Sequence, residues 1–279
     1  MENKKIILAG GSGFLGTSLA RYFAAQNDVV ILTRHLPAGG PRPTRIRWVA
    51  WDGVHPDPAW VDELEGADLV VNLAGRSVDC RYHERERRAI LDSRVLSTLA
   101  IGRAIAGLRR LPACWINLGS ATIYRHATEE PQTEQGGTIS PWRPDNVPAN
   151  TLDRLRQARN RWLAGWRRPR STGRTAQQTG TDWTRLDFSV EVCRRWEEAF
   201  RAPETPSTRR IVLRTAIVLG QDGALPAFRR LARWGLGGRQ GTGRSASAGS
   251  MTAILCGWWH GSQTSHRLEV CTTALRPAV

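Results

Sequence analysis

The amino-acid sequence predicts an α/β protein with a parallel, doubly wound sheet, and three observations support this fold class. Short apolar runs of strand length recur along the first half of the 279-residue chain. Helix-length segments separate most of these runs, as parallel strands require. The first run ends directly in a glycine-rich turn. With 41% hydrophobic residues and 12 tryptophans, the chain can bury a core, which excludes wholesale disorder.

The elements follow in a regular order up to about residue 118. The first apolar run is followed by Leu15, Leu19 and Phe23 at helical spacing, and Asn27-Asp28 ends that helix. The expected strands are residues 5–9, 29–33, 46–51, 67–75 and 114–118, with helices over 60–64 and 84–109. After an irregular stretch, the pattern predicts a helix over 188–200, a strand over 211–219 and a helix over 225–234. Beyond Arg244 no amphipathic pattern remains.

A GxxGxxG motif lies between the first strand and the first helix. Glycine permits a tight turn there and lets the backbone approach a pyrophosphate, whose charge then lies at the helix N-terminus. The motif therefore predicts a dinucleotide site, and the alternative is a turn that only packs the helix on the strand. The predicted cofactor-binding residues of this turn are Gly10, Ser12, Gly13, Phe14, Leu15 and Gly16.

The ends of the second and fourth strands refine this site. An acidic residue after the second strand would bind the ribose hydroxyls of NAD, whereas an arginine accommodates the 2′-phosphate of NADP. The sequence has Thr33-Arg34 and no acid there, which favours NADP, with NAD as the alternative cofactor. Arg34 has a second interpretation as a solvated surface side chain. Leu73, Ala74 and Gly75 end the fourth strand, where small residues let a ring system approach closely.

These motifs together resemble the extended short-chain dehydrogenase/reductase superfamily. More narrowly, they are similar to the nucleoside-diphosphate-sugar epimerase-like proteins of the NAD-dependent epimerase/dehydratase family. The resemblance implies a Rossmann fold, a nicotinamide dinucleotide and a small-molecule substrate such as a sugar nucleotide. The matching segments are Gly10–Gly16, Leu32–Arg34, Asn72–Gly75, Ser93-Arg94, Gly119–Tyr124, Phe188-Ser189, Trp196-Glu197, Leu213–Thr215, Leu219-Gly220, Gly235–Gly238 and Gly241–Arg244.

The superfamily's usual Tyr-x-x-x-Lys pair is missing, because the chain has no lysine beyond Lys5. Arginine is a poor substitute, since it stays protonated. By resemblance, Ser120 takes the position that hydrogen-bonds the reacting carbonyl or hydroxyl, and the alternative is an ordinary strand-end cap. Tyr124 is a hypothetical acid/base, and the alternative is packing at a pocket rim. We interpret Cys193 as a buried thiol and Glu197 as a helix-surface acid.

The net charge of +15 belongs mostly to the later part of the chain. Residues 1–140 hold 17 basic and 15 acidic side chains, whereas residues 141–186 hold ten and three. No nucleic-acid-binding motif accompanies this excess, so we expect no nucleic-acid partner. We also expect no membrane span, since no apolar run approaches ~18 residues. The six histidines form no ligand-spaced cluster, so no metal is predicted, and five scattered cysteines without CxxC indicate a reducing, cytoplasmic location.

The chain divides into four segments. Residues 1–130 form the NAD(P)-binding Rossmann core, and 187–244 hold the remaining Rossmann and substrate-side elements. Residues 131–186 are an irregular Trp/Arg-rich insertion or loop, and 245–279 an atypical tail. By resemblance, the C-terminal substrate-binding part is small and incomplete. Because the reading frame one base earlier can encode a family-like peptide, we hypothesise a frameshift near Arg244. The functional prediction is an NAD(P)-dependent epimerase/dehydratase-like oxidoreductase, and the alternative is a non-catalytic or degenerate dinucleotide-binding protein.

Overall fold

The structure, a computed structural model, describes residues 2–38, 44–124, 132–134, 137, 139, 188–219 and 225–235, together with the backbone of 249–251 and 269–273. Almost all of the irregular segment predicted at 131–186 and most of the tail predicted at 245–279 therefore lie outside the described residues. The two parts predicted to carry the cofactor site and the substrate-side elements are described up to Gly235, except for 39–43, 125–131 and 220–224.

The main sheet of the described residues has seven strands, in the order β3-β2-β1-β4-β5-β6-β9, and every pairing in it is parallel. This confirms the doubly wound Rossmann-type sheet. Its strands are β1 (Lys5–Ala9), β2 (Asp28–Thr33), β3 (Ile46–Ala50), β4 (Leu69–Asn72), β5 (Cys114–Ser120), β6 (Arg209–Thr215) and β9 (Glu269–Thr273). The helices are α1 (Phe14–Phe23), α2 (Pro58–Leu64), α3 (Glu84–Ala106), η1 (Ala121–Ile123), α5 (Phe188–Arg201) and α6 (Leu225–Arg233).

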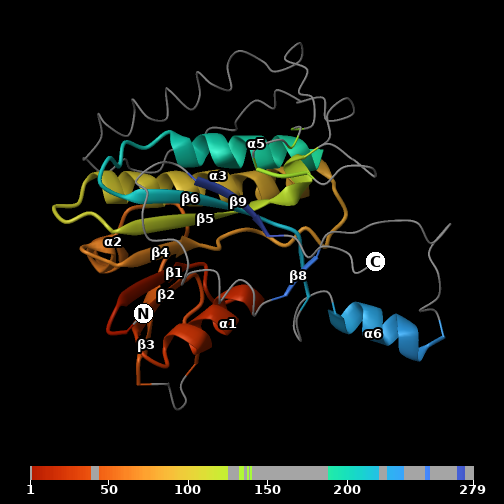
Figure 1. Ribbon diagram of the computed structural model, residues 1–279, viewed down its shortest axis with the longest axis horizontal. Helices are drawn as coiled ribbons and strands as arrows, with labels where there is room; N and C mark the ends of the chain where they lie inside the picture. The colour runs from red at the N-terminus through yellow and green to blue at the C-terminus, as the bar shows by residue number, and fades with distance from the viewer. Residues whose placement is uncertain are drawn as a thin grey trace, which may run out of the picture.

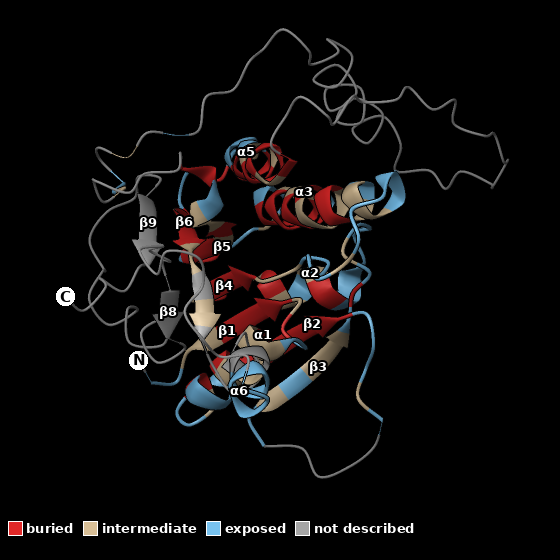
Figure 2. Ribbon diagram, turned by 90° about the vertical axis from the view of Figure 1, so that its right-hand side faces the viewer, coloured by how far each residue is buried: buried red, intermediate tan, exposed pale blue. Residues whose placement is uncertain are grey.

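The sheet separates two hydrophobic cores because successive side chains along a strand point to opposite faces. Ile7 and Val30 pack with Trp60 of α2, Ile101 of α3 and Phe200 of α5 on one face. On the other face, Ile6, Leu8, Val29 and Ile31 pack with Leu19 and Phe23 of α1. Figure 1 shows α3 and α5 along one side of the sheet and α1 along the other. The central strands are buried (Figure 2), as their near-continuous apolar runs predict.

The strand order reverses between β1 and β4, and this switch point positions the candidate site. From β1 the chain proceeds to β2 on one side, and later returns to β4 on the other. The Gly10 amide donates to the Leu32 carbonyl at 2.8 Å, and the Leu73 amide donates to the Ala9 carbonyl at 2.8 Å. The turns after β1 and β4 are thereby held at one edge of the sheet. In open α/β sheets, ligands bind in the crevice at such a point.

Two strand predictions need correction. The strand expected over 211–219 is two strands, since β6 ends at Thr215 and β7 (Ile217–Leu219) leaves the main sheet to pair with β8 (Gly249–Met251). The part of the chain beyond Arg244, which has no amphipathic pattern, supplies both β8 and the edge strand β9. These strands are defined by pairing with distant partners, which local periodicity does not report.

Candidate functional site

Two glycines of the turn after β1 are required by packing. Gly10 has φ of +73°, in the left-handed region, and a Cβ at this position would lie 2.7 Å from the Ala74 Cα. A Cβ at Gly16 would collide with the Gly11 backbone. Helix α1 and the turn after β4 therefore approach the β1 turn more closely than any side chain would allow. Close packing therefore requires glycine at these two positions, and their predicted role in cofactor binding stays a prediction.

Gly13 lies in different surroundings and supports the dinucleotide interpretation. It is the N-cap of α1, and among the described residues no side chain caps the helix there and no atom would lie within 4 Å of a Cβ at Gly13. Both Ser12 and Gly13 are exposed. The backbone N–H groups of a helix N-terminus attract anions. Open space in front of this N-terminus, at the switch point, fits the pyrophosphate of a dinucleotide.

The ends of β2 and β4 border the same space. Thr33 is buried, and its hydroxyl is 3.1 Å from the Ser12 hydroxyl, which ties the end of β2 to the glycine turn. Arg34 follows it and is exposed, so both interpretations of this side chain stay open. Leu73 and Ala74 are half-buried and Gly75 is exposed. The residues predicted to bind the cofactor are thus brought together at one sheet edge, with Phe14 and Leu15 in the first turn of α1.

A cavity of about 510 Å³ lies beyond β4, at the carboxyl ends of β5 and β6. Helices α3 and α5 form its walls together with the chain that follows β4. Its lining is largely apolar and includes Val78, Ile90, Phe188, Val192 and Trp196. The polar side chains that line it are Tyr82, Arg94, Ser120, Thr122, Ser189, Cys193 and Thr215. A concave, mostly apolar site with a few convergent polar groups is the usual form of a small-molecule site.

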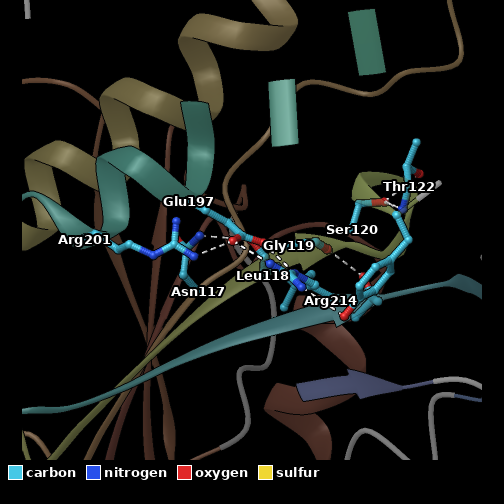
Figure 3. A network of polar contacts seen from close by, with 10 residues as sticks. Asn117, Leu118, Gly119, Ser120, Thr122, Glu197, Arg201 and Arg214 are labelled. Carbon is cyan, nitrogen blue, oxygen red and sulfur yellow. Dashed lines mark hydrogen bonds and ion pairs between the residues drawn. The ribbon is translucent and has the colours of Figure 1, made fainter. Parts of the chain in front are cut away.

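Ser120 lines this cavity and also caps the turn that follows β5. Its hydroxyl accepts the Thr122 amide at 3.2 Å and lies 2.8 Å from the Thr122 hydroxyl (Figure 3). The position of Ser120 as a cap is therefore compatible with its predicted role as a site residue, because the same hydroxyl group lies at the cavity. A hydroxyl fixed by its neighbour is a defined donor or acceptor for a bound ligand.

Tyr124 is buried behind the cavity lining and is not among the residues that line it. Its hydroxyl accepts a hydrogen bond from Arg214 Nη1 at 2.9 Å, and the Arg214 guanidinium lies 5.0 Å from the centre of its ring. The structure thus brings Ser120 to the cavity and holds the Tyr124 hydroxyl against Arg214. An acid/base role for Tyr124 stays a hypothesis.

Glu197 is buried, and the interpretation of this residue as a helix-surface acid is wrong. Its two carboxylate oxygens accept from Arg214 Nε at 2.7 Å and Nη2 at 2.9 Å, and Arg201 Nη2 donates to it at 2.7 Å (Figure 3). Burial alone lowers the pKa of Arg214, but the hydrogen bonds with Glu197 and Tyr124 outweigh burial and hold that pKa above its ordinary value. This ion pair joins α5 to β6 and, through Tyr124, to the end of η1.

A second buried network was not predicted from the sequence. Asn72 Nδ2 donates to the Thr98 hydroxyl at 2.9 Å and to Asn117 Oδ1 at 2.8 Å, and Trp196 Nε1 donates to the Thr98 hydroxyl at 2.9 Å. The network joins β4, β5, α3 and α5 beneath the cavity. Asparagine within otherwise apolar parallel strands was the available sequence signal, because a buried amide needs partners.

Other expectations concern metals, membranes and thiols. Within the described residues, no group of three or more His, Cys, Asp or Glu side chains is placed to hold a metal ion. None of the described helices combines the length and apolar character needed to cross a bilayer. Cys80 is half-buried and Cys114 is buried, and Cys193 is buried as expected. The side chains of Cys256 and Cys271 are not among the parts of the chain that the structure describes.

The fold and the switch-point site define a class: a Rossmann-type α/β protein with an open glycine turn at the head of α1 and a small-molecule cavity beside it. Comparison with known proteins then gives the family. The model of the NAD dependent epimerase/dehydratase family matches residues 6–148. The chain belongs to this family, which confirms the resemblance in its motifs.

The individual relatives share about a quarter or less of their residues with this chain. An epimerase family protein of Staphylococcus saprophyticus, SSP1921, is 26% identical over 245 residues, which are 86% of this chain and 64% of that protein. The chain therefore spans less than two thirds of this relative's length. A crystal structure of human epimerase family protein SDR39U1 with NADPH has a TM-score of 0.65 at 22% identity, covering 96% of this chain and 73% of the human one. MoeE5 with UDP-glucuronic acid and NAD has a TM-score of 0.63 at 16% identity, covering 97% and 76%.

Proposed function

We propose that this chain binds a nicotinamide dinucleotide at the β1–β4 switch point and acts as an oxidoreductase of the epimerase/dehydratase type on a small molecule in the adjoining cavity. The observation that carries the proposal is the open N-terminus of α1 at Gly13, on the same sheet edge as the cavity that Ser120 lines. Family membership and the NADPH and NAD in the similar structures support it.

The glycine turn and the ends of β2 and β4 would hold the cofactor. Backbone N–H groups at Ser12–Gly16 would bind the pyrophosphate, and Leu73–Gly75 would border the ring system. Thr33 holds the turn through its hydrogen bond with Ser12. We propose NADP rather than NAD, because the exposed Arg34 directly follows β2, where an arginine can accommodate a 2′-phosphate. When bound, the nicotinamide supplies or accepts a hydride.

In the cavity, this chain's own residues bind and orient the substrate. The Ser120 hydroxyl would hydrogen-bond the carbonyl or hydroxyl that reacts, and the largely apolar walls would contact the rest of the substrate. A sugar nucleotide is the proposed substrate, in keeping with the family and with the UDP-sugar bound to MoeE5. Tyr124 is the proposed acid/base candidate, and its hydroxyl accepts a hydrogen bond from Arg214.

A second candidate function is dinucleotide binding without catalysis. Two observations favour it: the chain has no Tyr-x-x-x-Lys pair, and the Tyr124 hydroxyl faces Arg214 rather than the cavity. The two functions are separated by following nicotinamide absorbance while UDP-sugars are added to the cofactor-loaded protein. A change in absorbance with the wild type supports catalysis if the rate of this change is at least tenfold lower in Ser120→Ala. A protein that binds NADPH but shows no exchange with any UDP-sugar supports the binding function.

Cofactor binding is tested by calorimetry with NADPH and NADH. We expect NADPH to bind more tightly, and Arg34→Ala to weaken NADPH binding about tenfold without changing NADH binding, since one charge-assisted phosphate contact is lost. Arg21→Ala, an exposed arginine in the last turn of α1, is the matched control. If the wild type binds neither nucleotide, the proposal is wrong. If Arg34→Ala leaves NADPH binding unchanged, Arg34 is a surface side chain.

A further inference from the structure

The cavity contains one charged side chain among its described lining residues, that of Arg94. This arginine comes from α3 and is half-buried. A Cβ built on Gly75 would lie 3.2 Å from the Arg94 Cζ, so the guanidinium also borders the proposed cofactor edge. Arg94 thus lies between the two halves of the site, and the cofactor and catalytic roles proposed above do not use it.

The Arg94 guanidinium is held in one place by its surroundings. Nη1 donates to the backbone carbonyl of Arg76 at 3.0 Å and to that of Ile90 at 3.1 Å. Its Cζ lies 5.3 Å from the ring centre of Trp196, which is itself fixed by the hydrogen bond to Thr98. A cation stacked on an aromatic ring and bonded to two carbonyls is preorganised to bind a ligand.

The positive charge of Arg94 has no counter-ion in the part of the chain that the structure describes. Neither Nε nor Nη2 donates a hydrogen bond there, and no described carboxylate lies within ion-pair distance. The buried Arg214, by contrast, is paired with Glu197. Burial lowers the pKa of Arg94 below its ordinary value, with Cys193 and Tyr82 opposing that shift. An uncompensated charge beside an apolar cavity favours an anionic ligand.

We propose that Arg94 binds a carboxylate of the substrate through the guanidinium edge that carries Nε and Nη2. That edge matches the two oxygens of a carboxylate. A carboxylate carries one negative charge, which the single cation neutralises, whereas a terminal phosphate dianion would leave a net charge against the apolar walls. The diphosphate of a sugar nucleotide is common to UDP-glucuronic acid and UDP-glucose, so it produces no preference between the two. The inference rests on the proposed function and deepens it, since it makes the substrate an acid.

The test uses pairs of ligands that differ in a carboxylate. Calorimetry on the full chain with NADPH compares UDP-glucuronic acid with UDP-glucose and, without the nucleotide, glucuronate with glucose. In at least one pair, we expect the wild type to bind the acid at least about tenfold more tightly than the neutral sugar. Arg94→Gln should remove this preference. Arg94→Lys should keep part of it. Arg88→Gln, which changes an exposed arginine on the same helix, should behave as the wild type.

Three results would overturn the inference: a wild type without preference for an acid in either pair, a preference that survives in a folded Arg94→Gln, or an NADPH affinity that falls tenfold in Arg94→Gln without sugar. The last result would assign the arginine to the cofactor phosphates. If Arg94→Gln does not fold, Arg94→Lys decides: a reduced preference together with unchanged NADPH binding supports the inference, and an unchanged preference contradicts binding through the guanidinium edge. If glucuronate binds with an Arg94-dependent preference while neither UDP-sugar binds, the sugar-nucleotide proposal fails and the carboxylate site stands.

Discussion

At the scale of single residues, Glu197 and Arg214 show how one buried ion pair organises the region behind the cavity. Both side chains are almost inaccessible, with exposed fractions of 3% and 5%, and their contact is bidentate. The net free energy that such a pair contributes is small, because both groups lose hydration. Removing one partner is costly, since it leaves the other charge buried.

Glu197→Ala should therefore lower the free energy of unfolding by about 3–5 kcal/mol, because Arg214 loses its counter-ion. Glu198→Ala is a matched control, since Glu198 is the next residue of the same helix and is exposed. The free energy of unfolding of Glu198→Ala should stay within about 0.5 kcal/mol of the wild-type value, once the difference in helix propensity between Glu and Ala is subtracted. Urea denaturation measures both. Equal losses in the two variants would contradict a structural role for the ion pair.

Gly13 and Gly16 offer a second contrast between neighbouring residues. Alanine at Gly16 collides with the Gly11 backbone, so Gly16→Ala should lower the free energy of unfolding by about 1–3 kcal/mol. Gly13→Ala meets no neighbour and should cost at most about 1 kcal/mol as a changed N-cap. Its methyl group would stand in front of the helix N-terminus. NADPH affinity should therefore fall about tenfold in Gly13→Ala, and an unchanged affinity would place the pyrophosphate elsewhere.

At the scale of elements, α5 is joined to α3 in two ways. Apolar side chains of both helices, among them Ile90, Val95 and Val192, form a cluster of their own. The Trp196 hydrogen bond to Thr98 adds a polar contact that extends through Asn72 and Asn117 to two strands. The position of α5, and with it one wall of the cavity, depends on both.

Trp196→Phe should lower the free energy of unfolding by about 1–3 kcal/mol, since it removes a buried donor and leaves unfilled volume. Trp234→Phe is the control, because Trp234 is 75% exposed. Thermal melting of both variants followed by circular dichroism measures the difference. Because Arg94 stacks on Trp196, the first variant should also weaken the preference for an acidic ligand. A melting temperature equal to that of the control would show that this bond does not hold α5.

At the scale of the whole molecule, the strand order decides where the site lies. Residues from three separate turns, after β1, β2 and β4, meet at one edge because the order reverses between β1 and β4. The same edge continues to β5 and β6, where the cavity opens. The charge of +15 lies mostly outside this arrangement, and residues 1–140 are nearly neutral.

The frameshift hypothesis belongs at this scale, because it concerns a whole segment of the chain. If the reading frame changes near Arg244, the coding DNA over codons 240–279 should encode a family-like peptide in the frame one base earlier. Sequencing the gene measures this directly. A neighbouring frame interrupted by stop codons, or one without family-like sequence, would contradict the hypothesis.

Much of the fold and half of the site were predictable from the sequence because their causes are local. Gly10, Gly13 and Gly16 occur at fixed spacing between a strand and a helix, where the backbone geometry of a tight turn requires glycine. Arg94 belongs to the Ser93-Arg94 segment that resembles the family, but its place in a cavity was not predictable, since an arginine on a charged helix has the pattern of a solvated side chain. Glu197 was misplaced for the same reason: its partner Arg214 comes from another element.

The parallel sheet, the glycine turn and the absence of the Tyr-x-x-x-Lys pair could all be deduced from the amino-acid sequence alone. These follow from apolar periodicity, from backbone sterics and from residue identity, all of which are local. The tertiary structure decided which arginine is neutralised and which faces a cavity, and it turned the Tyr124 hydroxyl toward Arg214. Burial and charge pairing depend on neighbours brought together by folding, so the electrostatic character of the site appears first in three dimensions.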